Sequence, residues 1–172
     1  MSSGNGTSCL VTDSPIGPLT LLAAGGALCG LYMNGRVPAS AGPITAASPG
    51  ADDAAVLART AGQLEEYFEG GRDRFDLPLA LRGTVFQRGV WEALLGVGYG
   101  QTVTYAQLAD RIGRPTAVRA VGHANGRNPV SIIVPCHRVV GSDGSLTGYG
   151  GGLDNKRRLL DLERGVSEGR AQ

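Results

Sequence analysis

The amino-acid sequence predicts an α+β fold, with a small α/β domain first and a mostly helical domain second. In the first half, three short apolar runs are separated by turn-forming residues, as expected for the strands of one sheet. In the second half, apolar residues recur at helical spacing, and Gly and Pro residues divide the pattern. We expect an N-terminal domain at residues 1–78, a C-terminal domain at residues 79–165 and a tail at residues 166–172.

The N-terminal domain is predicted to contain three strands, one loop and one helix. The strands are expected at residues 9–12, 19–23 and 28–33, separated by the turn sequences DSPIGP and GG. Residues 34–52 are rich in Ala, Ser, Pro and Gly and predict a loose surface loop. The helix is expected over residues 54–68, with Asp52 or Asp53 as its cap.

The C-terminal domain begins with a helix whose apolar face consists of Phe86, Val90, Leu94 and Leu95, with Trp91 beside them. The sequence TYAQ at residues 104–107 matches the capping box S/T-x-x-E/Q and predicts a second helix that ends at Ile112. GRP at 113–115 breaks that helix, and Thr116 is expected to cap a third helix over residues 117–124. Two short helices around such a turn indicate either a DNA-binding helix-turn-helix or an ordinary helical hairpin.

Composition favours a water-soluble globular protein of a reducing cytoplasm. The 172 residues are 42% hydrophobic and 18% charged, and no apolar run approaches the roughly 20 residues of a membrane span. The start MSSGNGTS lacks the pattern of a signal peptide. Cys9, Cys29 and Cys136 form no CxxC pair, which argues against a disulfide framework and a zinc site. Residues 84–163 carry a net charge of +3, which permits an anionic partner.

The stretch VPCHRVV at residues 134–140 carries the strongest indication of chemistry. An apolar run over residues 130–134 predicts a buried strand that Pro135 ends, so that Cys136 lies where a core element meets a turn. His137 and Arg138 can favour the thiolate, which is the nucleophilic form of cysteine. Adjacent side chains of an extended chain point to opposite sides, so proton transfer between Cys136 and His137 needs a bend or a bridging water.

A histidine base needs a third group to orient it, and a carboxylate is the natural choice. Asp161 and Glu163, both near the end of a predicted helix, are candidates, and the residues alone leave the choice open. Asn128, just upstream of the cysteine, offers a side-chain donor and acceptor. The sequence TGYGGG at 147–152 indicates either a flexible connector or a mobile loop that presents Tyr149 to the flat face of a ligand.

Together these motifs resemble the O6-alkylguanine-DNA alkyltransferases, also called methylated-DNA–protein-cysteine methyltransferases. The resemblance runs from about Thr84 to Glu163 and rests on TYAQLA, RAVG, NP, IVPCHRVV, TGYGGG and the final helix in that order. DSPIGPL matches in the N-terminal half, for which the family implies a ribonuclease H-like fold. The alternatives are a non-catalytic binder of alkylated DNA, a helix-turn-helix repressor and a cysteine hydrolase.

The resemblance implies a catalytic group of five residues. Cys136 is expected to accept the alkyl group, with His137 as its base through a water and Glu163 orienting the histidine. Asn128 is expected to brace the segment that holds the cysteine, and Tyr105 to protonate the departing base. The residues expected to bind DNA or the base are Thr104, Arg119, Ala120, Gly122, Val139, Tyr149 and Gly150.

The resemblance also implies how the DNA is held. Double-stranded DNA is bound through its minor groove by the second helix of the helix-turn-helix, whose Ala120, Gly122 and Ala124 are small. Arg119 is expected to fill the space of the extruded nucleotide, and Tyr149 to belong to a lid over the flipped base. Gly150 stands where some members have Ser, so a hydroxyl contact from residue 150 to the base is not assumed. Val97-Gly98 stands where members often have Ile-Pro, a departure expected to loosen the approach to Tyr105.

The implied reaction is direct-reversal DNA repair. An alkyl group moves from O6-alkylguanine, or from O4-alkylthymine, in a flipped-out base to Cys136. The product is a thioether without a carbonyl for water to attack, so each molecule is expected to act once. We expect a cytoplasmic monomer that needs no metal, cofactor or soluble methyl donor, with cooperative assembly along DNA left open.

Overall fold

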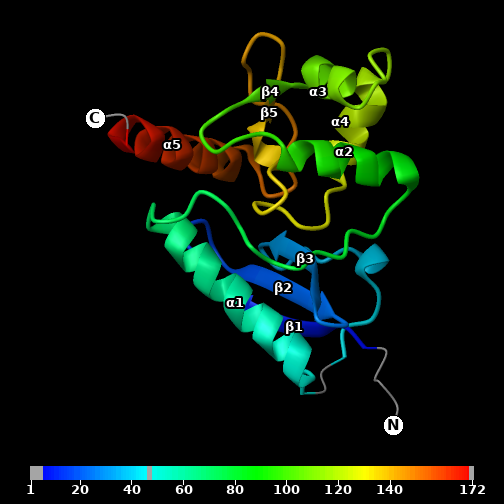
Figure 1. Ribbon diagram of the computed structural model, residues 1–172, viewed down its shortest axis with the longest axis vertical. Coiled ribbons are helices and arrows are strands. Elements are labelled where there is room, and N and C mark those ends of the chain that lie inside the picture. The colour runs from blue at the N-terminus through cyan, green and yellow to red at the C-terminus, as the bar shows by residue number, and fades with distance from the viewer. Residues whose placement is uncertain (1–5, 46–47, 171–172) are drawn as a thin grey trace. The chain divides into compact units, whose positions relative to one another are not determined.

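The computed structural model describes residues 6–45 and 48–170, and it divides into two units between Leu81 and Arg82 (Figure 1). Residues 46–47 of the predicted loop and residues 171–172 of the predicted tail lie outside the described residues, as do residues 1–5. The first unit holds a sheet and a long helix, whereas the second is mostly helical. This arrangement confirms the predicted α+β class.

The first unit is built on an antiparallel sheet of three strands in the order β1-β2-β3. The strands are β1 (Ser8–Thr12), β2 (Leu19–Ala24) and β3 (Ala27–Met33), each within one residue of its predicted range. Helix α1 (Ala51–Phe68) packs against all three strands. Apolar side chains of sheet and helix form the core of this unit, including Leu19, Leu21, Leu28, Leu31, Leu64 and Tyr67.

The predicted cap of α1 is wrong. The N-cap residue is Gly50, without a side-chain hydrogen bond, and Asp52 and Asp53 lie inside the first turn. Asp53 instead binds the sheet, because its carboxylate accepts hydrogen bonds from Ser8 Oγ at 2.9 Å and from the Gly26 amide at 2.7 Å. A carboxylate in the first turn still interacts favourably with the helix dipole. The predicted loop therefore ends at residue 50 and contains a short 3-10 helix, η1 (Ala39–Ala41).

Among the described residues, the second unit contains four α-helices and a parallel pair of two-residue strands, β4 (Val103–Thr104) and β5 (Val139–Val140). Its helices are α2 (Val85–Leu95), α3 (Tyr105–Arg111), α4 (Val118–Gly126) and α5 (Leu153–Arg170). Helix α2 packs on α3 and α4, and the buried Trp91 donates its indole hydrogen to the Ala124 carbonyl at 2.9 Å. Leu95, predicted to face the core, is 47% exposed, whereas the neighbouring Leu94 is buried. Residues 166–170, predicted as a tail, continue α5.

Helices α3 and α4 form the predicted helix-turn-helix. The capping box is confirmed, since Thr104 Oγ1 accepts from the Gln107 amide at 3.1 Å and Gln107 Oε1 accepts from the Thr104 amide at 2.9 Å. The predicted cap Thr116 is wrong, because α4 starts one residue later and its N-cap, Ala117, makes no side-chain bond. The buried face of α4 carries Val121, Ala124 and Asn125, which leaves Arg119 and Ala120 exposed.

Candidate active site around Cys136

Residues 130–134 do not form the predicted strand. They form a tight turn in which the Val134 amide donates to the Val130 carbonyl at 2.9 Å, and Ile132 has φ 72°. A β-branched residue in the left-handed region costs of order 1–3 kcal/mol, which the burial of the Ile132 side chain offsets. The turn leads into a short 3-10 helix, η2 (Cys136–Arg138). Because successive side chains there are about 120° apart, the objection that Cys136 and His137 face opposite sides does not apply.

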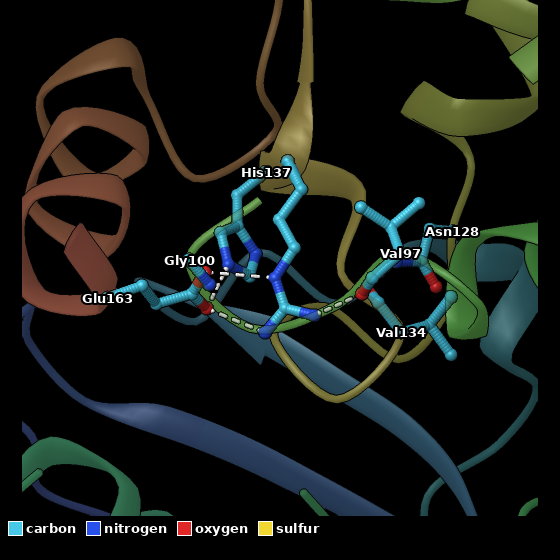
Figure 2. Close-up of polar contacts among 7 residues, drawn as sticks. Val97, Gly100, Asn128, Val134, His137 and Glu163 are labelled. Atoms are coloured by element: carbon cyan, nitrogen blue, oxygen red, sulfur yellow. Dashed lines mark hydrogen bonds and ion pairs between the residues drawn. The ribbon is translucent and has the colours of Figure 1, made fainter. Parts of the chain in front are cut away.

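Asn128 holds this turn from inside. Its Nδ2 donates to the Val134 carbonyl at 2.7 Å, and its Oδ1 accepts from the Val130 amide at 3.0 Å, as Figure 2 shows for the bond to Val134. Asn125, which was not predicted to belong to the site, donates from Nδ2 to the Cys136 carbonyl at 3.4 Å. The buried side-chain amides of Asn125, in α4, and of Asn128, just after α4, therefore fix the segment that carries the cysteine.

The Cys136 thiol is buried, with 4% of its residue surface exposed. Burial raises its pKa above the ordinary value, while hydrogen bonds from Asn128 and Ser131 and the charge of Lys156 act in the opposite direction. The thiol is therefore mostly protonated at neutral pH and needs a base to become a nucleophile. The prediction that Arg138 favours the thiolate is wrong, because its guanidinium binds Glu163 and the Val97 carbonyl instead.

Glu163 lies at the centre of a buried polar cluster (Figure 2). Its Oε1 is 2.8 Å from His137 Nε2 and 2.8 Å from Arg138 Nη2, and its Oε2 accepts from Arg138 Nε at 2.9 Å. The Gly100 amide adds a longer bond of 3.4 Å to Oε2. Asp161, the other candidate carboxylate, is exposed. The structure therefore places Glu163, and not Asp161, against the histidine.

The protonation states of this cluster follow from its charges. Burial opposes ionisation of Glu163, but the hydrogen bonds and charges of His137 and Arg138 outweigh it and lower the Glu163 pKa to about 2. Burial also lowers the pKa of His137 below 6.5, with Arg138 and Lys156 acting the same way and Glu163 opposing them. An ionised Glu163 accepts the Nε2 hydrogen of a neutral His137, which leaves a lone pair on Nδ1.

That Nδ1 atom is buried and has no hydrogen-bond partner among the described residues. Since buried polar atoms are almost always paired, such an atom marks a place for a water or a reacting group. His137 thus has one nitrogen fixed by Glu163 and the other available as a base, which is the arrangement of a nucleophile–base–carboxylate relay.

Two tyrosines border the site. The Tyr105 hydroxyl donates to the Thr147 carbonyl at 3.4 Å and accepts from Thr147 Oγ1 at 3.2 Å. The Tyr149 hydroxyl is buried without a hydrogen-bond partner among the described residues, and burial, followed by the charges of Cys136 and Glu163, raises the Tyr149 pKa well above its ordinary value. Gly150 is exposed and next to open space.

The residues predicted to bind DNA lie mainly on α4 and its surroundings. Arg119 and Ala120 are exposed, and a Cβ on the half-exposed Gly122 would lie 3.5 Å from the Tyr105 ring. The small-residue side of α4 therefore adjoins Tyr105. Thr104 is engaged as the cap of α3, and Val139 is buried in β5, paired with Val103.

Val97-Gly98, which stands where members of the resembled family often have Ile-Pro, has a structural role. The Val97 carbonyl accepts from Arg138 Nη1 at 2.6 Å, so this backbone helps to hold the arginine that neutralises Glu163. The Gly98 amide donates to Gln101 Oε1 at 3.2 Å. Proline has no amide hydrogen and could not make this bond.

Besides Asn125, two functional candidates were missed in the sequence, Lys156 and Thr147. Lys156 is fully buried on the same face of α5 as Leu159, Leu160 and Glu163. The spacing i, i+3, i+4 and i+7 of these four residues was readable in the sequence and would have placed the lysine on the core side. Thr147 carries no such signal, because its role depends on the fold of a glycine-rich loop.

The described residues contain no group of three or more His, Cys, Asp or Glu side chains able to hold a metal ion. Within the same ranges, no helix is both long and apolar enough to cross a membrane.

Comparisons with known proteins agree with this geometry. Residues 85–165 match the family model described as 6-O-methylguanine DNA methyltransferase, DNA binding domain, and residues 9–81 match its ribonuclease-like domain. The methylated-DNA–protein-cysteine methyltransferase of Mycobacterium bovis is 52% identical over 152 residues, covering 88% of this chain and 89% of its own length.

Solved structures show the same likeness. The O6-methylguanine methyltransferase of Mycobacterium tuberculosis superposes with a TM-score of 0.80 at 49% identity, covering 94% of this chain and 93% of the other. The structure of Mycobacterium tuberculosis OGT in complex with DNA superposes with a TM-score of 0.82 at 48% identity, covering 92% of this chain and 94% of the other. The fold is that of a two-domain alkyltransferase. The chain belongs to the 6-O-methylguanine DNA methyltransferase family.

Proposed function

We propose that this protein repairs DNA by direct reversal, moving the alkyl group of O6-alkylguanine to the sulfur of Cys136. The observation that carries the proposal is the buried relay in which Cys136 adjoins His137, whose Nε2 is fixed by Glu163 and whose Nδ1 is unpaired. Family membership and the likeness to a relative solved with DNA support the same activity. O4-alkylthymine, which carries its alkyl group on a comparable exocyclic oxygen, is the second substrate.

The protein binds double-stranded DNA with α4 in the minor groove. The exposed Ala120 and the half-exposed Gly122 allow the helix backbone to approach the groove closely. The alkylated oxygen lies inside the base stack, so the nucleotide must be flipped out at a cost of a few kcal/mol. Arg119, exposed on α4, enters the duplex and offsets part of that cost by occupying the vacated space. Tyr149, with its unpaired buried hydroxyl, lies over the flipped base.

The transfer is a displacement at a saturated carbon. A bond forms between Cys136 Sγ and the alkyl carbon while the bond from that carbon to O6 breaks, and its electron pair passes to the guanine. His137 Nδ1 takes the thiol proton through a water, and Tyr105 gives a proton to a ring nitrogen of the departing base. Solvent water then carries the proton from protonated His137 to the Tyr105 phenolate, so both residues are restored; overall, guanine gains one proton and the Cys136 sulfur exchanges its proton for the alkyl group.

The product thioether is permanent, so one molecule repairs one base. No other reactant is consumed, since the thiol supplies both the nucleophile and the proton. We assign this activity to the monomer, because the relay is built from residues of a single chain. We place it in the cytoplasm, where a free thiol stays reduced.

Mass spectrometry after incubation with duplex DNA containing O6-methylguanine tests the proposal. The peptide that contains Cys136 gains the mass of one CH2 unit, and the amount modified saturates at one equivalent per protein chain. Cys136→Ser abolishes the transfer while duplex binding persists. Transfer by the serine variant, or continued turnover by a single chain, would overturn the proposal.

A further inference from the structure

Lys156 is a fully buried lysine in the first turns of α5, beside the reacting groups. Burial lowers its pKa, while the charge of Cys136 acts in the opposite direction. Among the described residues, no carboxylate forms an ion pair with it. An uncompensated buried ammonium is costly, so the interactions that Lys156 does make should have a purpose beyond packing.

The hydrogen bond of the Lys156 ammonium is to the main chain of a glycine-rich loop. Nζ donates to the Thr147 carbonyl oxygen at 2.8 Å. Backbone bonds fix the two ends of this loop, from Gly141 to Ser145 and from Gly152 to Tyr149. Thr147 lies between these ends, where the described contacts that hold it come from Lys156 and Tyr105.

Thr147 in turn makes two hydrogen bonds with the hydroxyl of Tyr105, one as donor and one as acceptor. Its Oγ1 donates to the phenol oxygen at 3.2 Å, and its carbonyl accepts the phenol hydrogen at 3.4 Å. The same carbonyl oxygen therefore serves the lysine and the tyrosine. The bond of 3.4 Å is long, so the phenol can exchange it for a stronger acceptor such as a guanine ring nitrogen.

We propose that Lys156 is a positioning residue of the alkyl transfer, which acts by holding Thr147 so that Thr147 holds the Tyr105 hydroxyl. The inference rests on the proposed function, in which Tyr105 protonates the departing base. It adds two residues, one from α5 and one from the loop, to the reaction.

A double-mutant cycle between Lys156→Met and Tyr105→Phe tests this coupling. Methionine keeps the length and apolar character of the lysine stem but has no ammonium. Single-turnover transfer is measured at saturating O6-methylguanine duplex. Tyr105→Phe slows it about 100-fold, as expected for loss of a proton donor, and Lys156→Met slows it about tenfold. Because both substitutions act on the same group, the double variant is no more than about twofold slower than Tyr105→Phe alone.

Three further measurements separate a positioning role from a structural one. Lys156→Met leaves the half-saturating DNA concentration unchanged, since only the rate at saturation depends on Tyr105. Arg157→Met, which removes an exposed charge from the same turn of α5, is the matched control and transfers at the wild-type rate. Thr147→Val removes the hydroxyl bond to Tyr105 at an exposed position, and it shows the same non-additivity with Tyr105→Phe even if Lys156→Met does not fold.

Independent, multiplicative effects of Lys156→Met and Tyr105→Phe would overturn the inference, as would an equal loss in Arg157→Met. Multiplicative effects of Thr147→Val and Tyr105→Phe would do the same. Absence of transfer by the wild-type protein would instead refute the proposed function itself, so the two failures are distinguishable.

Discussion

Replacement of Glu163 by Gln tests whether the buried cluster is held by a charge. In the wild-type protein, the Arg138 guanidinium makes two bonds of 2.8 and 2.9 Å to the Glu163 carboxylate. The substitution keeps the shape of the side chain but leaves this guanidinium without a counter-charge. Removal of one partner of a buried ion pair destabilises proteins by about 3–5 kcal/mol. The lowering of the Glu163 pKa from 4.5 to about 2 corresponds to about 3 kcal/mol of folded-state stability. This value agrees with the range expected for loss of a buried ion-pair partner.

The pH dependence of the effect has a definite sign. A carboxylate with a lowered pKa stabilises the folded state fully above its unfolded value near 4.5, and this contribution is lost as the pH falls towards about 2. The difference in unfolding free energy between wild type and Glu163→Gln is therefore about 3 kcal/mol at pH 7 and shrinks progressively below pH 4.5.

Urea unfolding followed by tryptophan fluorescence measures this difference directly. Trp91 is the single tryptophan of the chain and is buried in the same unit as Glu163, so its emission reports the unfolding of that unit. Asp161→Asn, on an exposed position of the same helix, is the control and changes stability by less than about 0.5 kcal/mol. A loss of under about 1 kcal/mol in Glu163→Gln, or a difference that does not shrink in acid, would refute this account.

Three other expectations follow from the site. The transfer rate falls to half of its neutral value only below pH 6.5, because the pKa of His137 is lowered below that value; a rate already halved at pH 7 would contradict this. Arg119→Ala slows transfer from duplex DNA more than transfer from the free alkylated base, which needs no flipping, and equal losses would remove Arg119 from that role. Gly122→Ala raises helix stability by up to about 1 kcal/mol but weakens duplex binding. The control Gly89→Ala in α2 gives a similar gain in stability and leaves duplex binding unchanged.

Several elements were predictable because their signals are local. The strands of the first unit follow from short apolar runs between turn residues, and the start of α3 follows from a hydroxyl and an amide three residues apart. The motif around Cys136 was readable for the same reason. Resemblance to a family then selected Glu163 over Asp161, although the shared helical face of Leu159, Leu160 and Glu163 also favours that choice.

Other elements could not be predicted because their partners are distant in the sequence. Asp53 was expected to cap a helix, yet its carboxylate binds Ser8, 45 residues away. The apolar run at 130–134 has the composition of a strand, but the Asn128 side chain takes the bonds that a neighbouring strand would need. Arg138 was assigned to the thiol, but Glu163 lies 25 residues further on and neutralises it.

The sequence by itself indicated which cysteine to expect as the nucleophile, which histidine follows it and, within one residue, where the first three strands begin and end. Apolar periodicity and capping act over a few residues, so they can be read without the fold. The tertiary structure decided which polar groups are buried together, namely Glu163 with Arg138 and His137, and Lys156 with Thr147. Burial of a charge depends on where the chain brings its compensating partner, and that is settled only when distant segments pack.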